Sequence, residues 1–430
     1  MQARSTLSHP RWLAVAAVVA PLLACQPDAD PAGPNGFLAA SLNGVPFTEG
    51  LASPGWQGTA ATFVAQARVL PCAAGRLYAF VGVAQYLAVQ RAEAAAGGTD
   101  AAAFVSSANG IGRGGRSRLE TDRGAVAGAS AFVLNYLFPG HAQALEDMVT
   151  AQANTGPGQP HPAFAAGEAI GRAVGAEIVT RAQTDGWEHA FTGTIPTGAG
   201  FWKSNTDPAT VACGQLPGVR PWFLTSASQF RSAPPPAFGP DPLSPFQVAL
   251  AEILDIALHR TQQQIDIATF WAQGTGTLTT PGVWVQRATA GITEHGLSER
   301  QATHLYALVS ATMADAQVGC WDTKETYWFI RPWQADPAIT VVAAVGKPNH
   351  PSYPSGHSCT SASAAEVLST FFPEQRAELD AMVIAAGLSR MYGGIHYRFD
   401  IDAGQQLGRS VARFAIEADR SGHSVLTPDD

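Results

Sequence analysis

The sequence predicts an all-α protein: packed helical bundles forming a single large domain, with a long irregular Pro-rich insertion. Apolar residues make up 46% of the 430 residues, and most of them recur at helical spacing. Alternating β-branched runs are scarce, and the candidates for short strands are 275–280 and 340–345. Because strands do not alternate with helices along the chain, a doubly wound α/β fold is disfavoured.

Composition excludes several other classes of protein. Charged residues are 14% of the chain, and so apolar a chain is not a disordered one. The net charge is −8 and no run is rich in lysine or arginine, which argues against a nucleic-acid-binding protein. The 43 glycines and 30 prolines follow no three-residue period, so the chain is not a collagen.

The first 24 residues have the features of a signal peptide. Arg4 and Arg11 precede an apolar stretch at 12–24, which is shorter than the ~20 residues that a membrane span needs. The stretch leads into Cys25 in the sequence LLAC, which resembles a bacterial lipobox and implies cleavage before Cys25 and a lipid on its thiol. An ordinary signal peptide or a buried helix is the alternative.

The expected organisation follows from this N-terminus. Residues 25–50 begin polar and Pro-rich, as flexible tethers do, and 51–430 form the all-α catalytic domain, with its active-site part at about 246–420. We therefore expect an exported protein that is lipid-anchored at the cell envelope, on the periplasmic or extracytoplasmic face. The role of residues 51–160 and the oligomeric state stay open.

Helical periodicity predicts the elements of the domain in chain order. Ser298 is the expected N-cap of a long helix, with Glu299 in its first turn. Residues 187–245 carry repeated prolines and no helical pattern, and so long an irregular segment is usually functional. The predicted helices span 76–95, 125–137, 141–153, 163–184, 246–269, 298 to about 329, 361–372, 374–389 and 400–419.

Two motifs in the last third of the chain place cations and backbone donors near one another. Lys324 and Arg331 are seven residues apart, and on a helix such positions share one face, so both cations can converge on one anion. Further on, Ser355, Gly356 and His357 directly precede a helical run. A helix N-terminus offers free N–H groups to an anion, the glycine allows close approach, and the histidine can exchange a proton.

A third motif adds another cation and a histidine–carboxylate pair. Arg390 is a bidentate fork for a tetrahedral oxyanion. His396 and Asp400 are four residues apart, about one helical turn, so the carboxylate can accept the Nδ1 proton and leave Nε2 free as a nucleophile or ligand. In a protein of net charge −8, this cluster predicts a site for a phosphate-shaped anion.

The three motifs together resemble those of one superfamily: the type 2 phosphatidic acid phosphatases, the bacterial acid phosphatases and the vanadium-dependent haloperoxidases. The family pattern is K-x6-RP, PSGH and SR-x5-H-x3-D in that order, and this sequence contains all of it without departure. The resemblance covers roughly residues 165–420. Upstream of the motifs it is closest to the soluble, haloperoxidase-related branch.

The resemblance implies a role for each motif residue. His396 is the nucleophile of a phosphatase, or the single protein ligand to vanadium in a haloperoxidase. His357 is the general acid and base, and Asp400 orients His396. His350 and Trp321 are candidates for a halide or supporting role, with a loop-capping histidine and a buried bundle tryptophan as the alternatives. The residues expected to bind the oxyanion are Lys324, Arg331, Ser355, Gly356 and Arg390.

Two enzymatic functions fit the same pocket. The first is a vanadate-dependent haloperoxidase that uses peroxide to oxidise bromide or iodide, and it is favoured by Trp321, His350 and the resemblance upstream. The second is a metal-independent acid phosphatase, which needs no cofactor and acts on a phosphate ester through a phosphohistidine at His396. A non-enzymatic anion-binding lipoprotein is a third reading, but it leaves His357 and the His396–Asp400 pair without a purpose.

Four cysteines remain after Cys25, and an exported protein can oxidise them. Four cysteines allow three pairings, and their spacing alone does not choose among them. If the pocket assembles as expected, Cys320 and Cys359 are brought near each other. We then expect the disulfides Cys320–Cys359 and Cys72–Cys213, with four buried thiols as the alternative.

Overall fold

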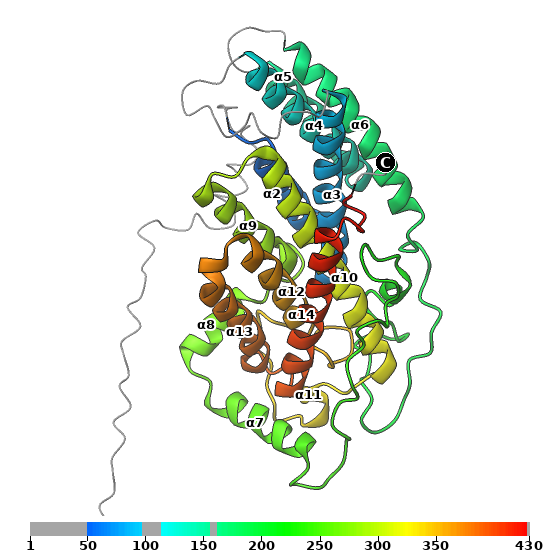
Figure 1. Ribbon diagram of the computed structural model, residues 1–430. Helices are drawn as coiled ribbons and strands as arrows, with labels where there is room; N and C mark the ends of the chain where they lie inside the picture. Colours follow the sequence, from blue (N-terminus) through cyan, green and yellow to red (C-terminus); the bar gives the residue numbers. More distant parts are fainter. Residues whose placement is uncertain (1–49, 97–112, 155–160, 428–430) are drawn as a thin grey trace, which may run out of the picture.

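The computed structural model describes residues 50–96, 113–154 and 161–427, and within them it contains thirteen α-helices and no strand (Figure 1). The all-α prediction is therefore confirmed. Phe201 and Phe329 form an isolated β-bridge. The predicted signal peptide and nearly all of the predicted tether lie outside the described residues.

The first five helices form the upper part of the molecule in Figure 1. Helices α4 and α6 approach so closely that a Cβ on Gly124 would lie 2.0 Å from the Phe164 carbonyl oxygen, and one on Gly167 would lie 1.9 Å from that of Thr121. Only glycine fits such backbone contact. These helices are α2 (Ser53–Gln66), α3 (Pro71–Ala95), α4 (Arg113–Leu137), α5 (Ala142–Ala153) and α6 (Pro162–Gln183).

Helix α3 passes through the core rather than over the surface. It is long and apolar enough to cross a membrane by length and composition, yet 89% of its most apolar window is buried inside the protein. Its side chains pack against α4, α6 and α10 (Glu299–Tyr327). Most residues of α10 are themselves buried. The apolar character of α3 is therefore explained by its place in the core.

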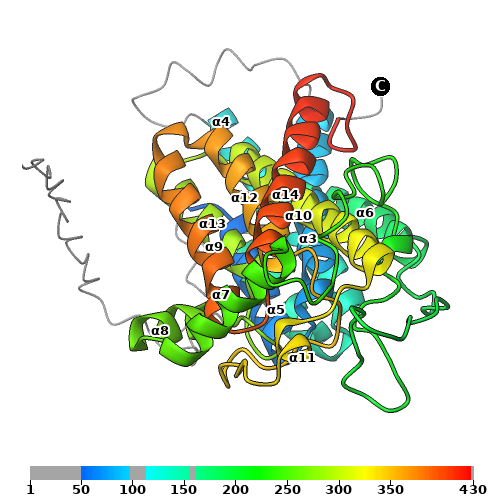
Figure 2. The same ribbon diagram turned by 90° about the horizontal axis from the view of Figure 1, so that it is seen from below.

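Most of the remaining helices build the lower part of the molecule in Figure 1, which Figure 2 shows from below. Helix α10 is capped as predicted: the Ser298 hydroxyl accepts a hydrogen bond from the Gln301 N–H in a capping box. Helices α12 and α14 pack against each other and against α10. The elements are α7 (Pro245–His259), α8 (Gln262–Phe270), α9 (Thr279–His295), α11 (Pro332–Ala335), α12 (Gly356–Phe371), α13 (Arg376–Tyr392) and α14 (Arg398–Arg420).

Several predicted elements differ from the observed ones. The single helix expected at 246–269 is two helices, because Arg260 leaves the helical conformation and Thr261 starts α8 with its own capping box. The helix expected at 361 begins at Gly356. Helices α2 and α9 were not predicted. Neither strand candidate is a strand: 340–345 is loop, 275–278 is the turn that leads into α9, and 279–280 are the first residues of that helix.

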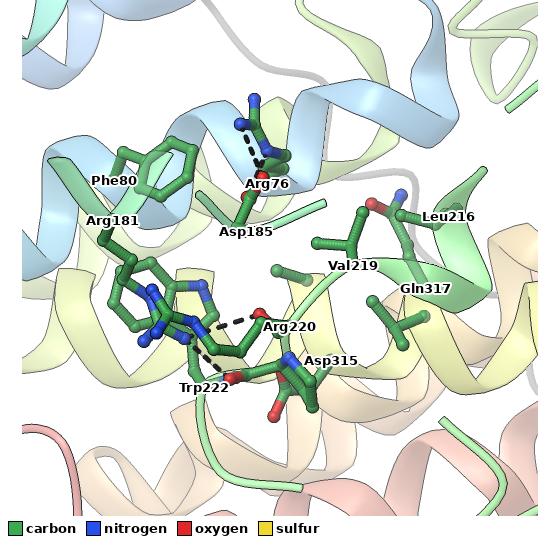
Figure 3. A pocket seen from close by; sticks show the side chains of 13 residues that line it. Arg76, Phe80, Arg181, Asp185, Leu216, Val219, Arg220, Trp222, Asp315 and Gln317 are labelled. Carbon is green, nitrogen blue, oxygen red and sulfur yellow. Dashed lines mark hydrogen bonds and ion pairs between the residues drawn. The ribbon is translucent and has the colours of Figure 1, made fainter. Parts of the chain in front are cut away.

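The segment 187–245 is irregular as predicted, apart from a single 3-10 turn at Leu216–Gly218. A buried carboxylate of α10 binds this segment through hydrogen bonds. The Asp315 carboxylate of α10 accepts hydrogen bonds from the N–H groups of Trp222, Phe223 and Leu224, at 2.7, 2.7 and 3.0 Å. Figure 3 shows this carboxylate beside Trp222, with the Arg76–Asp185 ion pair nearby. Burial raises the pKa of Asp315 to about 6.

We expect Asp315→Ala to destabilise the protein strongly. The variant leaves three buried N–H groups without an acceptor, which costs about 3–5 kcal/mol of unfolding free energy. Asp322→Ala is the matched control, since Asp322 also lies on α10 and ties the same segment through the half-exposed Arg231, a pair worth about 1 kcal/mol or less. Urea unfolding measures both, and equal losses would contradict the assignment.

Candidate active site

The three motifs meet at one cavity of about 300 Å³. Its wall is contributed by the end of α10, the loop before α12, the first turn of α12, the last turn of α13 and the connection to α14. Four predicted residues, Lys324, Arg331, Ser355 and Asp400, lie behind this wall and are fully buried. The predicted residues that line the cavity are Trp321, His350, Gly356, His357, Arg390 and His396.

Lys324 supports the loop in front of it. Its Nζ donates hydrogen bonds to the carbonyl oxygens of Pro351 (2.8 Å), Ser352 (2.9 Å) and Pro354. These three bonds use all the protons of the ammonium, so its charge acts on the cavity from behind. Burial lowers the pKa of Lys324 to about 8.

Lys324 and Arg331 do not share a helix face, contrary to the sequence argument. Helix α10 ends at Tyr327, and Trp328 turns the chain with a left-handed φ of 47°. Arg331 then reaches the site from the start of α11, and its Nη1 donates to the Ile395 carbonyl oxygen at 2.7 Å. The two cations converge because the chain turns back on itself.

His396 is held in one tautomer by its two neighbours. Arg331 Nη1 lies 2.9 Å from His396 Nε2, and because a guanidinium can only donate, Nε2 accepts and Nδ1 carries the proton. That proton points to Asp400 Oδ2 at 2.8 Å. Burial and the nearby cations Arg331 and Lys324 hold the pKa of His396 well below its usual value. The imidazole is therefore neutral, with a lone pair on Nε2.

Asp400 serves both as a helix cap and as the partner of His396. His396 precedes α14, so the pair does not lie on one helical turn as the spacing suggested. One carboxylate oxygen, Oδ2, accepts from Ser352 Oγ (2.5 Å), from His396 Nδ1 and from the Tyr397 N–H (3.1 Å). These donors orient the carboxylate, and through it they orient the histidine.

The first turn of α12 brings His357 into the cavity. Ser355 is its N-cap, and its Oγ accepts from the Ser358 N–H. His357 Nε2 donates to the Trp271 carbonyl oxygen at 2.8 Å, which leaves Nδ1 as the nitrogen that can exchange a proton. Burial lowers the pKa of His357, and the Arg390 charge lowers it further.

Arg390 presents a guanidinium to the cavity from the last turn of α13. Its Nε donates to Ser389 Oγ at 3.1 Å and its Nη2 donates to the Ala268 carbonyl oxygen at 3.2 Å. These contacts fix the plane of the guanidinium. Among the described residues the Nη1 of Arg390 has no protein acceptor. Its N–H groups therefore remain available to an anion.

Trp321 and His350 form one side of the cavity. Their rings lie 5.0 Å apart between centroids. The Trp321 indole N–H donates to the Ala212 carbonyl oxygen at 2.9 Å, and His350 Nδ1 faces Arg331 Nη2 at 3.1 Å. The Trp321 N–H is therefore not available to a ligand in the cavity.

The cysteines correct one of the two expected disulfides. Cys72 and Cys213 form a disulfide, with Cα atoms 6.3 Å apart. Cys320 and Cys359 do lie together behind the site, but both are free, buried thiols, and their side chains interact by a hydrogen bond. The location of both cysteines next to site motifs in the sequence was sufficient to predict that they lie close together, but it did not predict whether they form a disulfide.

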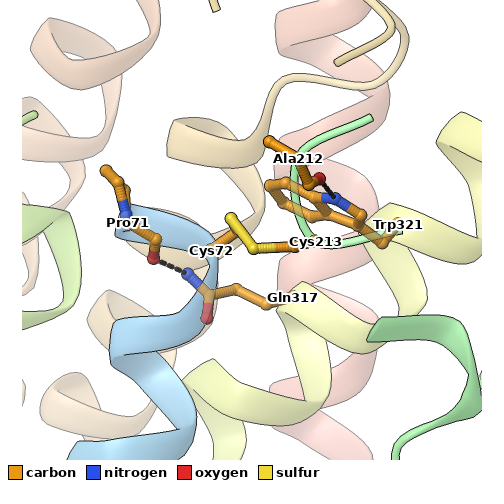
Figure 4. Close-up of a disulfide and its surroundings, with 6 residues drawn as sticks. All are labelled: Pro71, Cys72, Ala212, Cys213, Gln317 and Trp321. Atoms are coloured by element: carbon orange, nitrogen blue, oxygen red, sulfur yellow. Dashed lines mark hydrogen bonds between the residues drawn. A yellow bond between two sulfur atoms is a disulfide. The ribbon is translucent and has the colours of Figure 1, made fainter. Parts of the chain in front are cut away.

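Part of the cavity comes from segments in which the sequence showed no motif. The Cys72–Cys213 disulfide joins the start of α3 to the Ala212 segment, and both segments line the cavity. Figure 4 shows the disulfide with Gln317 and Trp321 nearby. Thr280 of α9 and the exposed Lys347 also line it. No spacing links these residues to the motifs, and only the fold brings them there.

The cavity suits an oxyanion. Its lining includes Lys347, Arg390 and three histidines, and it includes no carboxylate from the residues that the structure describes. Arg331 and Lys324 add charge from behind, and the Nε2 lone pair of His396 supplies a bond to a central atom. This donor set fits vanadate or phosphate.

Comparison with models of protein families finds a match for part of the chain. Residues 303–420 match the model of the PAP2 superfamily, and this segment contains all three motifs. This part of the chain thus resembles the PAP2 superfamily, and the fold of the whole chain is similar to that of vanadium-dependent haloperoxidases. No match is found among curated proteins.

Similar solved structures include bacterial vanadium-dependent haloperoxidases. A bacterial iodoperoxidase is 22% identical with a TM-score of 0.67, covering 89% of this chain and 95% of that one. The apo and holo forms of a bacterial chloroperoxidase are each 14% identical. Their TM-scores are 0.63 and 0.60, and the alignments cover 82% of this chain and 94% and 93% of theirs. At these identities the likeness shows the fold.

Proposed function

We propose that the protein is a vanadate-dependent haloperoxidase that uses peroxide to oxidise bromide or iodide. The observation that carries the proposal is the state of His396: neutral, protonated on Nδ1 toward Asp400, and with its Nε2 lone pair beside Arg331. Such a nitrogen can bond to vanadium. The similarity to haloperoxidases over 89% of the chain, well beyond the PAP2 segment, supports this branch of the superfamily.

The reaction is X⁻ + H₂O₂ + H⁺ → HOX + H₂O, in which the halide loses two electrons to peroxide. Vanadate held on His396 would supply the activation of peroxide. Arg390, with Lys324 and Arg331 behind it, balances the negative charge of the oxyanion. His357 Nδ1 can take up and return the proton that the reaction consumes.

An acid phosphatase is the second candidate, and the match to the PAP2 superfamily favours it. His396 Nε2 would attack phosphorus, His357 would protonate the leaving oxygen, and water would cleave the phosphohistidine. The same cations would stabilise the charge of the five-coordinate state.

One experiment separates the two candidates. The purified protein is assayed with and without orthovanadate, using bromide or iodide with hydrogen peroxide, and then p-nitrophenyl phosphate. We expect halide oxidation that depends on added vanadate. Hydrolysis of the phosphate ester that vanadate inhibits, without halide oxidation, would instead establish the phosphatase.

A further inference from the structure

One side of the molecule gathers exposed apolar side chains. Among the described residues nine large apolar side chains are exposed, and five of them lie on or directly before α7, α8 and α13. These helices lie near one another at the lower left of Figure 1 and on the left of Figure 2, and α13 packs against the other two. Such a surface marks an interaction site. The five residues are Leu243, Val248, Leu258, Phe270 and Ile384.

Helix α7 is apolar on its outward face, where a surface helix is normally polar. Positions 248, 251, 255 and 258 share one side of the helix, and all four are exposed. Val248 is 58% exposed and Leu258 is 64% exposed. The one charged residue of the four, Asp255, is bonded to His259 at 3.0 Å. A helix that is apolar on both faces is typically covered on both. The inward face consists of Phe246, Ala249 and Ile253.

The charges of α7 and α8 do not suit an anionic partner. Residues 243–270, all of which the structure describes, include no lysine and one arginine. Arg260 donates to the Tyr392 carbonyl oxygen at 2.6 Å, so its guanidinium is used within the protein. The Glu252 carboxylate is paired with Arg398. The occupant that fits this side is therefore apolar and without net negative charge.

The sequence supplies such an occupant, because it predicts a lipid on Cys25. Gly50, the first described residue, follows 25 residues later. A chain of that length can span at most about 90 Å, which exceeds the diameter of about 55 Å expected for a domain of this size. The anchor therefore keeps the domain at the membrane and allows any side of it to turn toward the lipid. The surface of the domain decides which side does so.

We propose that the side formed by α7 and α8 docks onto the zwitterionic lipid surface of the membrane to which the chain is anchored. The inference rests on the predicted lipid at Cys25 and is independent of the reaction that the site performs. The exposed side chains enter the boundary between headgroups and acyl chains, as those of interfacial helices do. Since apolar burial drives the contact, salt does not weaken it.

The docked side adjoins the active site. The carbonyl oxygens at the end of α8 accept hydrogen bonds from two site residues: Ala268 from Arg390 at 3.2 Å, and Trp271 from His357 at 2.8 Å. Docking through α7 and α8 thereby holds the cavity close to the membrane.

A fluorophore on α7 tests the proposal. Leu258→Cys is labelled with the environment-sensitive dye NBD, which spares Cys320 and Cys359 because both are buried. The full chain is reconstituted with phosphatidylcholine vesicles. We expect the NBD emission to shift to the blue, to rise about twofold or more, and to be quenched by a nitroxide carried on the lipid. The signal should persist in about 0.5 M NaCl.

Val425→Cys is the matched control. Val425 is also an exposed apolar residue, but it lies near the C-terminus, at the other end of the molecule from α7 in Figure 1, and its label should not change. Adding Val248→Asp to the Leu258→Cys protein should abolish the signal, because a charge resists transfer into lipid, whereas Val425→Asp should leave it unchanged.

The other outcomes overturn the proposal. Equal signals at both labels would mean that no side is preferred, and loss of the signal in salt would mean a charged contact. A blue shift that appears without vesicles as the protein concentration rises would assign this side to a second copy of the chain. Mass spectrometry of the same preparation checks the lipid on Cys25, and its absence also overturns the proposal.

Discussion

Replacing His396 with alanine should abolish oxyanion binding and turnover together. The variant removes Nε2, the nitrogen at the cavity wall that is held ready by Arg331 and Asp400. We expect the affinity for orthovanadate to fall by at least the ~100-fold that loss of a merely supporting group can cost. Phosphatase turnover, if present, should fall by about 10⁴-fold or more.

Orthovanadate is titrated into the wild-type protein and each variant, and calorimetry measures its affinity. His304→Ala is the matched control, because His304 also bonds to an aspartate, Asp419, at 2.9 Å and does not line the cavity. The control should bind vanadate as wild type does. Retained vanadate affinity in His396→Ala would show that the cations alone hold the anion.

Asp400→Asn should cost much of the activity while leaving the fold intact. An amide oxygen in the place of Oδ2 can still accept from Ser352, His396 and the Tyr397 N–H, so the helix cap is kept. The amide carries no charge, and it no longer stabilises the positive imidazole that forms when Nε2 bonds to vanadium or phosphorus. Loss of such a carboxylate costs about 10–100-fold in a metal site and about 10⁴-fold in a serine-protease triad.

Turnover and melting temperature measured on the same samples separate the two roles of Asp400. A residue that only favours the helix dipole is worth about 0.3–1 kcal/mol of stability and nothing in turnover. Asp419→Asn, in the His304 pair, is the control and should leave turnover unchanged. An Asp400→Asn variant with wild-type turnover would remove Asp400 from the mechanism.

Local sequence was sufficient for the elements whose signals lie within one helix. Ser298 marks the start of α10 because its cap needs only residues three positions away. The amphipathic spacing at 76–95 and 163–184 likewise located α3 and α6 to within a few residues at most ends. Helix α9 was not predicted because it begins at Thr279, whose backbone is in a left-handed conformation that is rare for threonine.

The candidate site likewise has a part that the sequence predicted and a part that it did not. Motif order identified His357, Arg390 and His396, and the structure brings all three to one cavity. The sequence did not show that the Lys324 ammonium donates its three hydrogen bonds to backbone carbonyl oxygens. Nor did it show that Arg331 contacts His396 from beyond the end of α10. Those contacts depend on where the chain turns after Trp328, and a turn of that kind is set by packing around it.

A candidate oxyanion site was thus predictable from residue types and spacing, because few kinds of side chain bind such an anion. The shape of the cavity was not. Thr280, Lys347 and the Cys72–Cys213 disulfide reach it from parts of the chain with no common period. Their positions follow from long-range packing of α3, α9 and α10, and such packing is a property of the whole fold rather than of any local segment.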